Sequence, residues 1–189
     1  MGMGLEGLTS EQKSVIEKAR KRVVESIGKN MDLYGVNHTT GHLYGSLFFQ
    51  NQPITLDDMV EDMGMSKASM STSVRTLVDL NMINKVWERG FRKDLYQAEA
   101  DWFQTFTDFF AIKWRKAMEI NLQALRKSLS ELKRLAANHA QDERLHQVLS
   151  ADIEKLEMAV GYYLWLGTLI DKLESGEIYE FVPKERADN

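Results

Sequence analysis

Prolines are almost absent from this chain of 189 residues, which contains only Pro53 and Pro183. Because proline ends or kinks a helix, the long stretch between them is free to form continuous helices. Apolar residues in this stretch repeat at steps of three and four, which places them on one face of a helix. The sequence therefore predicts a mainly α-helical protein.

The composition excludes several classes of protein. With 43% apolar and 28% charged residues, the chain is typical of a globular domain and not of a disordered segment. It has no cysteine, which excludes a disulfide scaffold, a thiolate metal site and a cysteine nucleophile. The longest charge-free apolar stretch, residues 158–170, is too short to cross a bilayer, and residues 1–24 do not resemble a signal peptide. We expect a cytoplasmic protein without membrane contact.

The N-terminal part predicts two helices. The first is expected from Ser10, as N-cap, to Tyr34, where Gly35 ends it. The second is expected to start after Thr39 or Thr40 and to run toward Gln50.

Two short helices and a hairpin follow. Thr55 and Asp58 form a capping pattern, the apolar residues from Leu56 to Met63 share one face, and Gly64 suits a left-handed helix end. Ser66 is the predicted N-cap of the next helix, whose inward residues are Met70, Val74, Leu77 and Val78. Residues 83–87 and 95–98 have the composition of strands, separated by a polar turn. This order predicts a winged helix-turn-helix domain, which we place at residues 1–100.

Residues 101–136 and 141–174 predict two long helices. Apolar side chains step by four and three along each, which is typical of a coiled-coil seam. These side chains are Met118, Leu122, Leu125, Leu129, Leu132 and Ala136 in the first helix, and Leu149, Ile153, Leu156, Val160, Tyr163, Gly167 and Ile170 in the second. Trp114, Tyr162, Trp165 and Leu166 fall off this seam. We therefore expect residues 101–189 to form a homodimerisation region that can also sense a ligand.

The helix after Ser66 has an outer face suited to DNA. If Val74 points inward, then Ser69, Thr72, Ser73 and Thr76 point outward, with Lys67 and Arg75 at the edges. The hairpin from Lys85 to Lys93 carries four basic residues and one acidic residue, although the whole chain has a net charge of −4. Such a patch can neutralise phosphates. The predicted DNA-binding residues are Lys67, Ser69, Thr72, Ser73, Arg75, Thr76, Arg89, Arg92 and Lys93.

The motifs between Gly35 and Asp101 resemble those of a known family. The segments YGVNHTTGHLYGSLFF, SKASMSTSVRTL and RKDLY are similar to those of the MarR superfamily of winged-helix repressors, and within it to the GbsR-like branch. The resemblance implies a repressor of genes for the uptake or synthesis of glycine betaine and related osmoprotectants, with choline sensed by some members. It also implies that Arg92 is the wing-tip contact and that residues of the helix after Ser66 enter the groove.

Aromatic residues offer a candidate ligand site. Quaternary ammonium groups bind to aromatic cages through cation–π attraction, so Trp102, Phe106 and Tyr44 are weak candidates for such a cage. The alternative is that residues 102–110 form an apolar stripe that packs against the winged domain or a partner chain. His38 and His42 lack a third ligand nearby, so we expect no metal site. No catalytic constellation or cofactor motif stands out, and we do not expect an enzyme.

These observations predict a sequence-specific transcriptional regulator that binds a pseudo-palindromic operator in double-stranded DNA as a homodimer. Two alternatives stay open. One is a MarR-type regulator that responds to phenolic or aromatic ligands. The other is a winged-helix module that binds protein and not DNA.

Overall fold

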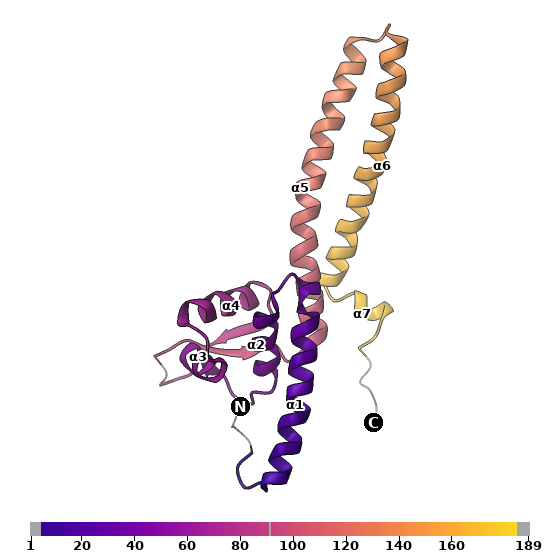
Figure 1. Ribbon diagram of the computed structural model, residues 1–189. Helices are drawn as coiled ribbons and strands as arrows, with labels where there is room; N and C mark the ends of the chain where they lie inside the picture. The colour runs from indigo at the N-terminus through magenta and orange to yellow at the C-terminus, as the bar shows by residue number, and fades with distance from the viewer. Residues whose placement is uncertain (1–4, 91, 185–189) are drawn as a thin grey trace. The chain divides into compact units, whose positions relative to one another are not determined.

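The computed structural model describes residues 5–90 and 92–184. The chain forms two compact units, Met1–Phe109 and Phe110–Asn189 (Figure 1). Together the two units contain long helices and one small antiparallel sheet, as the sequence predicts for the fold class.

Helices α1 (Ser10–Asn30) and α2 (His38–Phe48) open the first unit, joined by the short 3-10 helix η1 (Met31–Tyr34). The predicted N-cap of α1 is wrong by one residue: Thr9 is the cap, because Gln12 completes a capping box with it and Lys13 cannot do so with Ser10. Gly35 ends η1 in the left-handed conformation, as predicted. Asn37 caps α2, which therefore begins earlier than predicted.

Two glycines allow α1 and α2 to pack closely. A Cβ atom added at Gly41 would lie 2.6 Å from the Cβ atom of Met31 in η1 and 3.1 Å from the Cα atom of Gly28 in α1. One added at Gly45 would lie 3.0 Å from the Cα atom of Val24 in α1. Val24 and Met31 are themselves buried. The small residues of α2 thus fix its position against α1. Helix α2 in turn packs against α4 and β3 of the winged domain.

Helices α3 (Leu56–Met63) and α4 (Lys67–Asp79) follow the predicted pattern. Thr55 and Asp58 form the capping box of α3, and Gly64 ends that helix with a φ of 63°. Ser66 caps α4 through a hydrogen bond from the Ser69 backbone N–H. Local sequence signals therefore define both ends of the turn between the two helices.

The sheet has three strands in the order β1-β3-β2, all antiparallel. Strands β2 (Ile83–Val86) and β3 (Leu95–Ala98) form the expected hairpin, with Lys85 opposite Tyr96. Strand β1 (Ile54–Thr55) was not predicted, because a strand of two residues has no periodicity of its own. It exists only through its pairing with β3.

Helix α5 (Trp102–Asn138) begins in the first unit and continues into the second, where α6 (Glu143–Glu174) and the short α7 (Ile178–Phe181) follow. Figure 1 shows α5 and α6 side by side as a long hairpin. Asn121 donates to the hydroxyl of Tyr163 at 2.9 Å, and Arg115 donates to Asp171 and Glu174. In residues 5–90 and 92–184, no helix has both the length and the apolar character needed to cross a bilayer.

The seam of this hairpin contains the predicted residues, each buried or half-buried. One expectation is wrong: Leu166 is buried, packed with Met118 and Ile170, and does not lie off the seam. Its position one turn before Ile170 keeps it on the inner face of α6. Trp114, Tyr162 and Trp165 are exposed, as expected for residues off the seam.

We predict that Gly41→Ala lowers the free energy of unfolding by about 1–3 kcal/mol, because the new methyl group must displace Met31. Urea unfolding followed by circular dichroism measures this change. Gly28→Ala is the matched control, since its Cβ would lie 3.5 Å from its nearest neighbours, an ordinary contact. Equal stability of the Gly41→Ala variant and the wild type would contradict the close packing of α1 and α2.

Candidate nucleic-acid interface

The rotation of α4 about its axis is fixed by its buried side. Met70, Val74 and Leu77 are almost fully buried in the core of the winged domain. The opposite side therefore faces solvent. It carries four of the predicted DNA contacts: Lys67, Ser69, Thr72 and Arg75, all exposed, whereas Thr76 is half-buried.

Ser73 does not belong to this exposed face, and its prediction as a groove contact is wrong. Its side chain is only 6% exposed, and its Oγ accepts a hydrogen bond of 2.9 Å from the hydroxyl of Thr40 in α2. At 100° per residue, Ser73 precedes the buried Val74 on the side of α4 that packs against α2. Because a buried hydroxyl needs a partner, this pair joins the two helices and cannot reach DNA.

The exposed hydroxyl groups of α4 are partly used within the helix. Thr72 donates to the carbonyl oxygen of Ala68, and Thr76 donates to that of Thr72. Ser69 accepts from the hydroxyl of Ser66. These bonds explain how a helix tolerates so many poor helix formers. The Thr72 side chain is nevertheless exposed, and a threonine can offer DNA an oxygen that accepts a hydrogen bond and a methyl group that contacts thymine.

The lysines around α4 are held by carboxylates. Asp57, in the first turn of α3, forms two ion pairs. Its Oδ1 lies 2.7 Å from the Nζ of Lys67, and its Oδ2 lies 2.7 Å from the Nζ of Lys93. Lys85 contacts Asp94 at 2.8 Å within the hairpin. Hydrogen bonds from Lys67, and then from Lys93, lower the pKa of Asp57 to about 2. All three lysines are therefore partly neutralised in the absence of DNA.

The arginines differ from the lysines. Arg75 on α4 and Arg89 and Arg92 in the hairpin are exposed, and none forms an ion pair with another described residue. A guanidinium can bind phosphate or the edge of guanine with two parallel hydrogen bonds. The uncompensated positive charge of this surface therefore comes from residues suited to DNA.

Sequence reasoning missed two residues of this region. Thr40 appeared only as a possible helix start, and Asp57 was not singled out. Asp57 meets partners 10 and 36 positions away in the chain. Such contacts depend on the packing of α3 against α4 and the hairpin, and no local pattern contains them.

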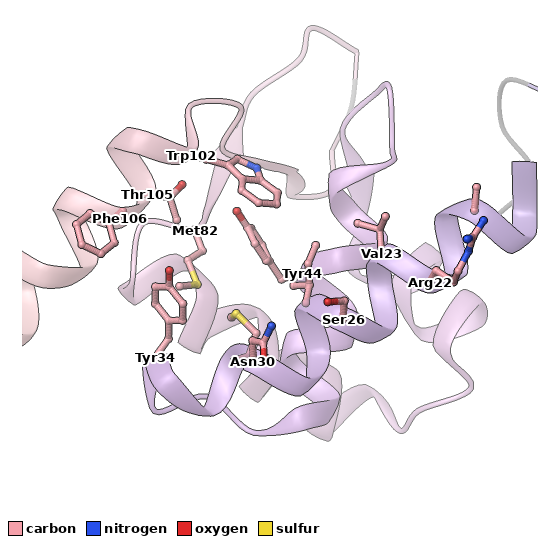
Figure 2. Close-up of a pocket in the computed structure, with 13 residues that line it drawn as sticks. Arg22, Val23, Ser26, Asn30, Tyr34, Tyr44, Met82, Trp102, Thr105 and Phe106 are labelled. Atoms are coloured by element: carbon pink, nitrogen blue, oxygen red, sulfur yellow. The ribbon is translucent and has the colours of Figure 1, made fainter. Parts of the chain in front are cut away.

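A cavity of about 660 Å³ lies in the first unit, lined by α1, η1, α2, Met82 and the start of α5. Tyr44, Trp102 and Phe106 all line it, so the structure brings together the three predicted ligand-binding residues (Figure 2). Tyr34 adds a fourth ring. Burial raises the pKa of the Tyr44 phenol, which keeps it neutral.

The lining of this cavity is mainly apolar and aromatic, with a few polar side chains. Figure 2 shows the Tyr44 ring pointing toward Trp102, with Thr105 and Phe106 on the same stretch of α5. Arg22, Ser26, Asn30 and Thr105 supply the polar groups, and no carboxylate is among the lining residues that the structure describes. A cluster of neutral rings with few polar groups is typical of a small-ligand site.

The histidines do not form a metal site with other side chains. His38 and His42 lie on the same helix, α2, with ring centroids 6.2 Å apart. In the described part of the chain, no three side chains of the metal-binding types gather.

We predict that the Asp57 carboxyl titrates near pH 2, well below its ordinary value of 3.8, because both lysines favour the charged form. The ion pairs therefore contribute stability above pH 3.8 that is lost as the pH falls toward 2. Carboxyl carbon NMR shifts across this range measure the titration. Lys93→Ala should raise this pKa, whereas Lys127→Ala, in α5, should not. Titration of wild-type Asp57 at its ordinary value would contradict the observed geometry.

Comparison with known proteins gives consistent results. Residues 102–180 match the C-terminal helical hairpin of GbsR family transcriptional regulators. The chain is 38% identical over 172 residues to the HTH-type transcriptional repressor GbsR of Bacillus subtilis, covering 91% of this chain and 95% of that protein. It is 37% identical over 176 residues to the HTH-type transcriptional repressor OpcR of the same organism, with 91% and 93% covered.

A solved structure described as the crystal structure of a transcriptional regulator matches the fold with a TM-score of 0.50 at 17% sequence identity. This match covers 78% of the present chain and 99% of the other. It supports the predicted fold class, and the sequence relatives confirm the prediction of a DNA-binding transcriptional repressor. The chain belongs to the GbsR family of transcriptional regulators.

Proposed function

We propose that this protein is a cytoplasmic, homodimeric repressor of the MarR superfamily that controls genes for osmoprotectant uptake or synthesis. The observation that carries the DNA-binding part is the outer face of α4. It presents Lys67, Ser69, Thr72 and Arg75 to solvent, and no acidic residue lies between Ser66 and Val78. Arg89 and Arg92 extend the same positive charge onto the hairpin.

In this proposal α4 enters the major groove, where Thr72 and Ser69 meet base edges and Arg75 meets guanine or phosphate. The hairpin arginines contact the phosphate backbone beside that groove. Two copies related by a two-fold axis would read a pseudo-palindrome with half-sites about 34–36 Å apart.

The exposed side of α6 supports a homodimer. Met158, Tyr162 and Trp165 follow one another at steps of four and three, so they share one face. They are 63%, 50% and 60% exposed. Large exposed apolar faces mark interaction sites, and a second copy of the chain would cover this face symmetrically.

The aromatic cavity supports a small effector. Tyr34, Tyr44, Trp102 and Phe106 can surround a quaternary ammonium group, with cation–π attraction of about 0.5–2 kcal/mol for each ring. Choline and glycine betaine contain this group, in accord with the family resemblance of the motifs. The cavity contacts α1, α2 and α5, so a bound ligand could shift the helices that support α4.

We predict that Arg92→Ala weakens binding to all DNA sequences and lowers the slope of log affinity against log salt by about 0.9, because one phosphate contact is lost. Fluorescence anisotropy with labelled duplexes at several salt concentrations measures both. Arg126→Ala, an exposed position in α5, is the control and should leave the slope unchanged. An unaltered slope in Arg92→Ala would remove Arg92 from the interface. Absence of DNA binding by the wild type in low salt would instead favour a module that binds protein.

We predict that choline or glycine betaine binds in the aromatic cavity and that Trp102→Ala weakens this binding by about tenfold, through loss of one ring of the cage. Isothermal titration calorimetry measures the affinity, with Trp87→Ala as the control, since Trp87 is an exposed tryptophan that does not line the cavity. Tight binding of salicylate, with no response to either ammonium compound, would favour the phenolic-ligand alternative.

A further inference from the structure

Asp57 joins three elements of the winged domain. It lies in the first turn of α3, yet its two carboxylate oxygens contact Lys67 at the start of α4 and Lys93 at the end of the hairpin turn. Both distances are 2.7 Å, and all three side chains are exposed. The two lysines thus share a single carboxylate at the edge of the proposed DNA-binding face.

This arrangement resembles the contact that DNA itself would make. A backbone phosphate is an oxyanion that attracts lysine ammonium groups, and Asp57 presents two anionic oxygens to the same two groups. The carboxylate binds them strongly enough to hold its own pKa near 2. A phosphate that approaches either lysine must therefore compete with Asp57 for its positive charge.

We propose that Asp57 is a specificity-determining residue that competes with DNA phosphate for Lys67 and Lys93 and so suppresses sequence-independent binding. The inference rests on the proposed DNA-binding function.

The suppression is selective because the two kinds of complex differ in fit. Non-specific complexes depend almost wholly on electrostatic attraction to phosphates, so two lysines withheld by Asp57 weaken them directly. In a specific complex, base contacts by α4 fix the phosphates close to both lysines, and flexible lysine side chains can then exchange Asp57 for phosphate. Asp57 thereby widens the ratio between operator and random affinities.

The decisive variant is Asp57→Asn. Its affinity for a short duplex of random sequence should rise about tenfold for each lysine released at ~0.1 M salt, and its salt slope should steepen by about 0.9 for each. The affinity for a duplex that the protein itself selects from a random pool should rise less. Fluorescence anisotropy over a series of salt concentrations measures all of these quantities with the full-length chain.

Glu61→Gln is the matched control, since Glu61 is an exposed acid on the same helix and contacts neither lysine. It removes the same charge without freeing a lysine and should produce only a small change. The Thr55–Asp58 capping box is untouched by either substitution, so α3 keeps its N-terminal cap. Thermal unfolding checks that both variants remain folded.

A second comparison begins in the wild-type background, where it does not depend on the folding of Asp57→Asn. Lys93→Ala should leave the salt slope for random DNA unchanged in the wild-type background, because Asp57 already withholds Lys93, whereas Arg92→Ala lowers it. In the Asp57→Asn background Lys93→Ala should lower the slope by about 0.9.

The outcomes separate the two proposals. If the wild type binds neither duplex in low salt, the proposed DNA-binding function is wrong. If the wild type binds DNA but Asp57→Asn behaves like Glu61→Gln, or Lys93→Ala lowers the wild-type slope as much as Arg92→Ala, only the competition by Asp57 is wrong. Weaker binding of both duplexes by folded Asp57→Asn would also overturn it, because Asp57 would then position the lysines for DNA.

Discussion

The burial of one side of α4 is the constraint on which the rest of the interface depends. Met70, Val74 and Leu77 pack into the core of the first unit and leave α4 a single rotation about its axis. Burial of three such side chains stabilises the unit by several kcal/mol, at about 1.5–3 kcal/mol for each. Rotation of α4 would expose this apolar surface, so the same packing that holds the helix also decides which side chains DNA can meet.

Charge is organised around this helix in two ways. The chain has a net charge of −4, yet Arg75, Arg89 and Arg92 present positive charge without a carboxylate partner among the described residues. The nearby lysines are held by Asp57 and Asp94. This division matters because the planar guanidinium of arginine forms two parallel hydrogen bonds, which select a matching partner. The ammonium of lysine is a point charge that can pair with any phosphate. In the proposed complex with DNA, the charge left uncompensated therefore lies on the residue type that can recognise base edges.

The features that the sequence predicted well are local ones. The Thr55–Asp58 capping box, the left-handed Gly64 and the Ser66 cap each depend on residues within three or four positions, and all are present. Strand β1 depends on a partner about 40 residues later, so its two residues gave no signal. The grouping of Tyr44, Trp102 and Phe106 at one cavity followed the chemistry of aromatic rings, but the cavity's walls from α1 were not foreseen.

The candidate site was harder to predict than the fold. Its residues depend on the exact rotation of a helix and on contacts between residues far apart in the sequence. Ser73 and Thr72 are neighbours in a helix, and a rotation of 100° separates a buried hydrogen bond with Thr40 from an exposed side chain. By periodicity, Thr72 lies about 160° around the helix from the inward Val74, whereas Ser73 lies only about 100° from it, at the boundary of the polar face. The role of Asp57 could not be predicted from the residues around it in the sequence, since its two lysine partners belong to other elements.

The most direct test of the central claim, that the outer face of α4 meets DNA, uses the absence of cysteine from the chain. A single cysteine introduced by Thr72→Cys can carry an iron chelate that cleaves nearby DNA, and Glu131→Cys in α5 provides the reference. The account predicts cleavage from Thr72→Cys in two half-sites about 34–36 Å apart. Cleavage no stronger than that from Glu131→Cys, with the labelled protein bound to the same duplex, would contradict it.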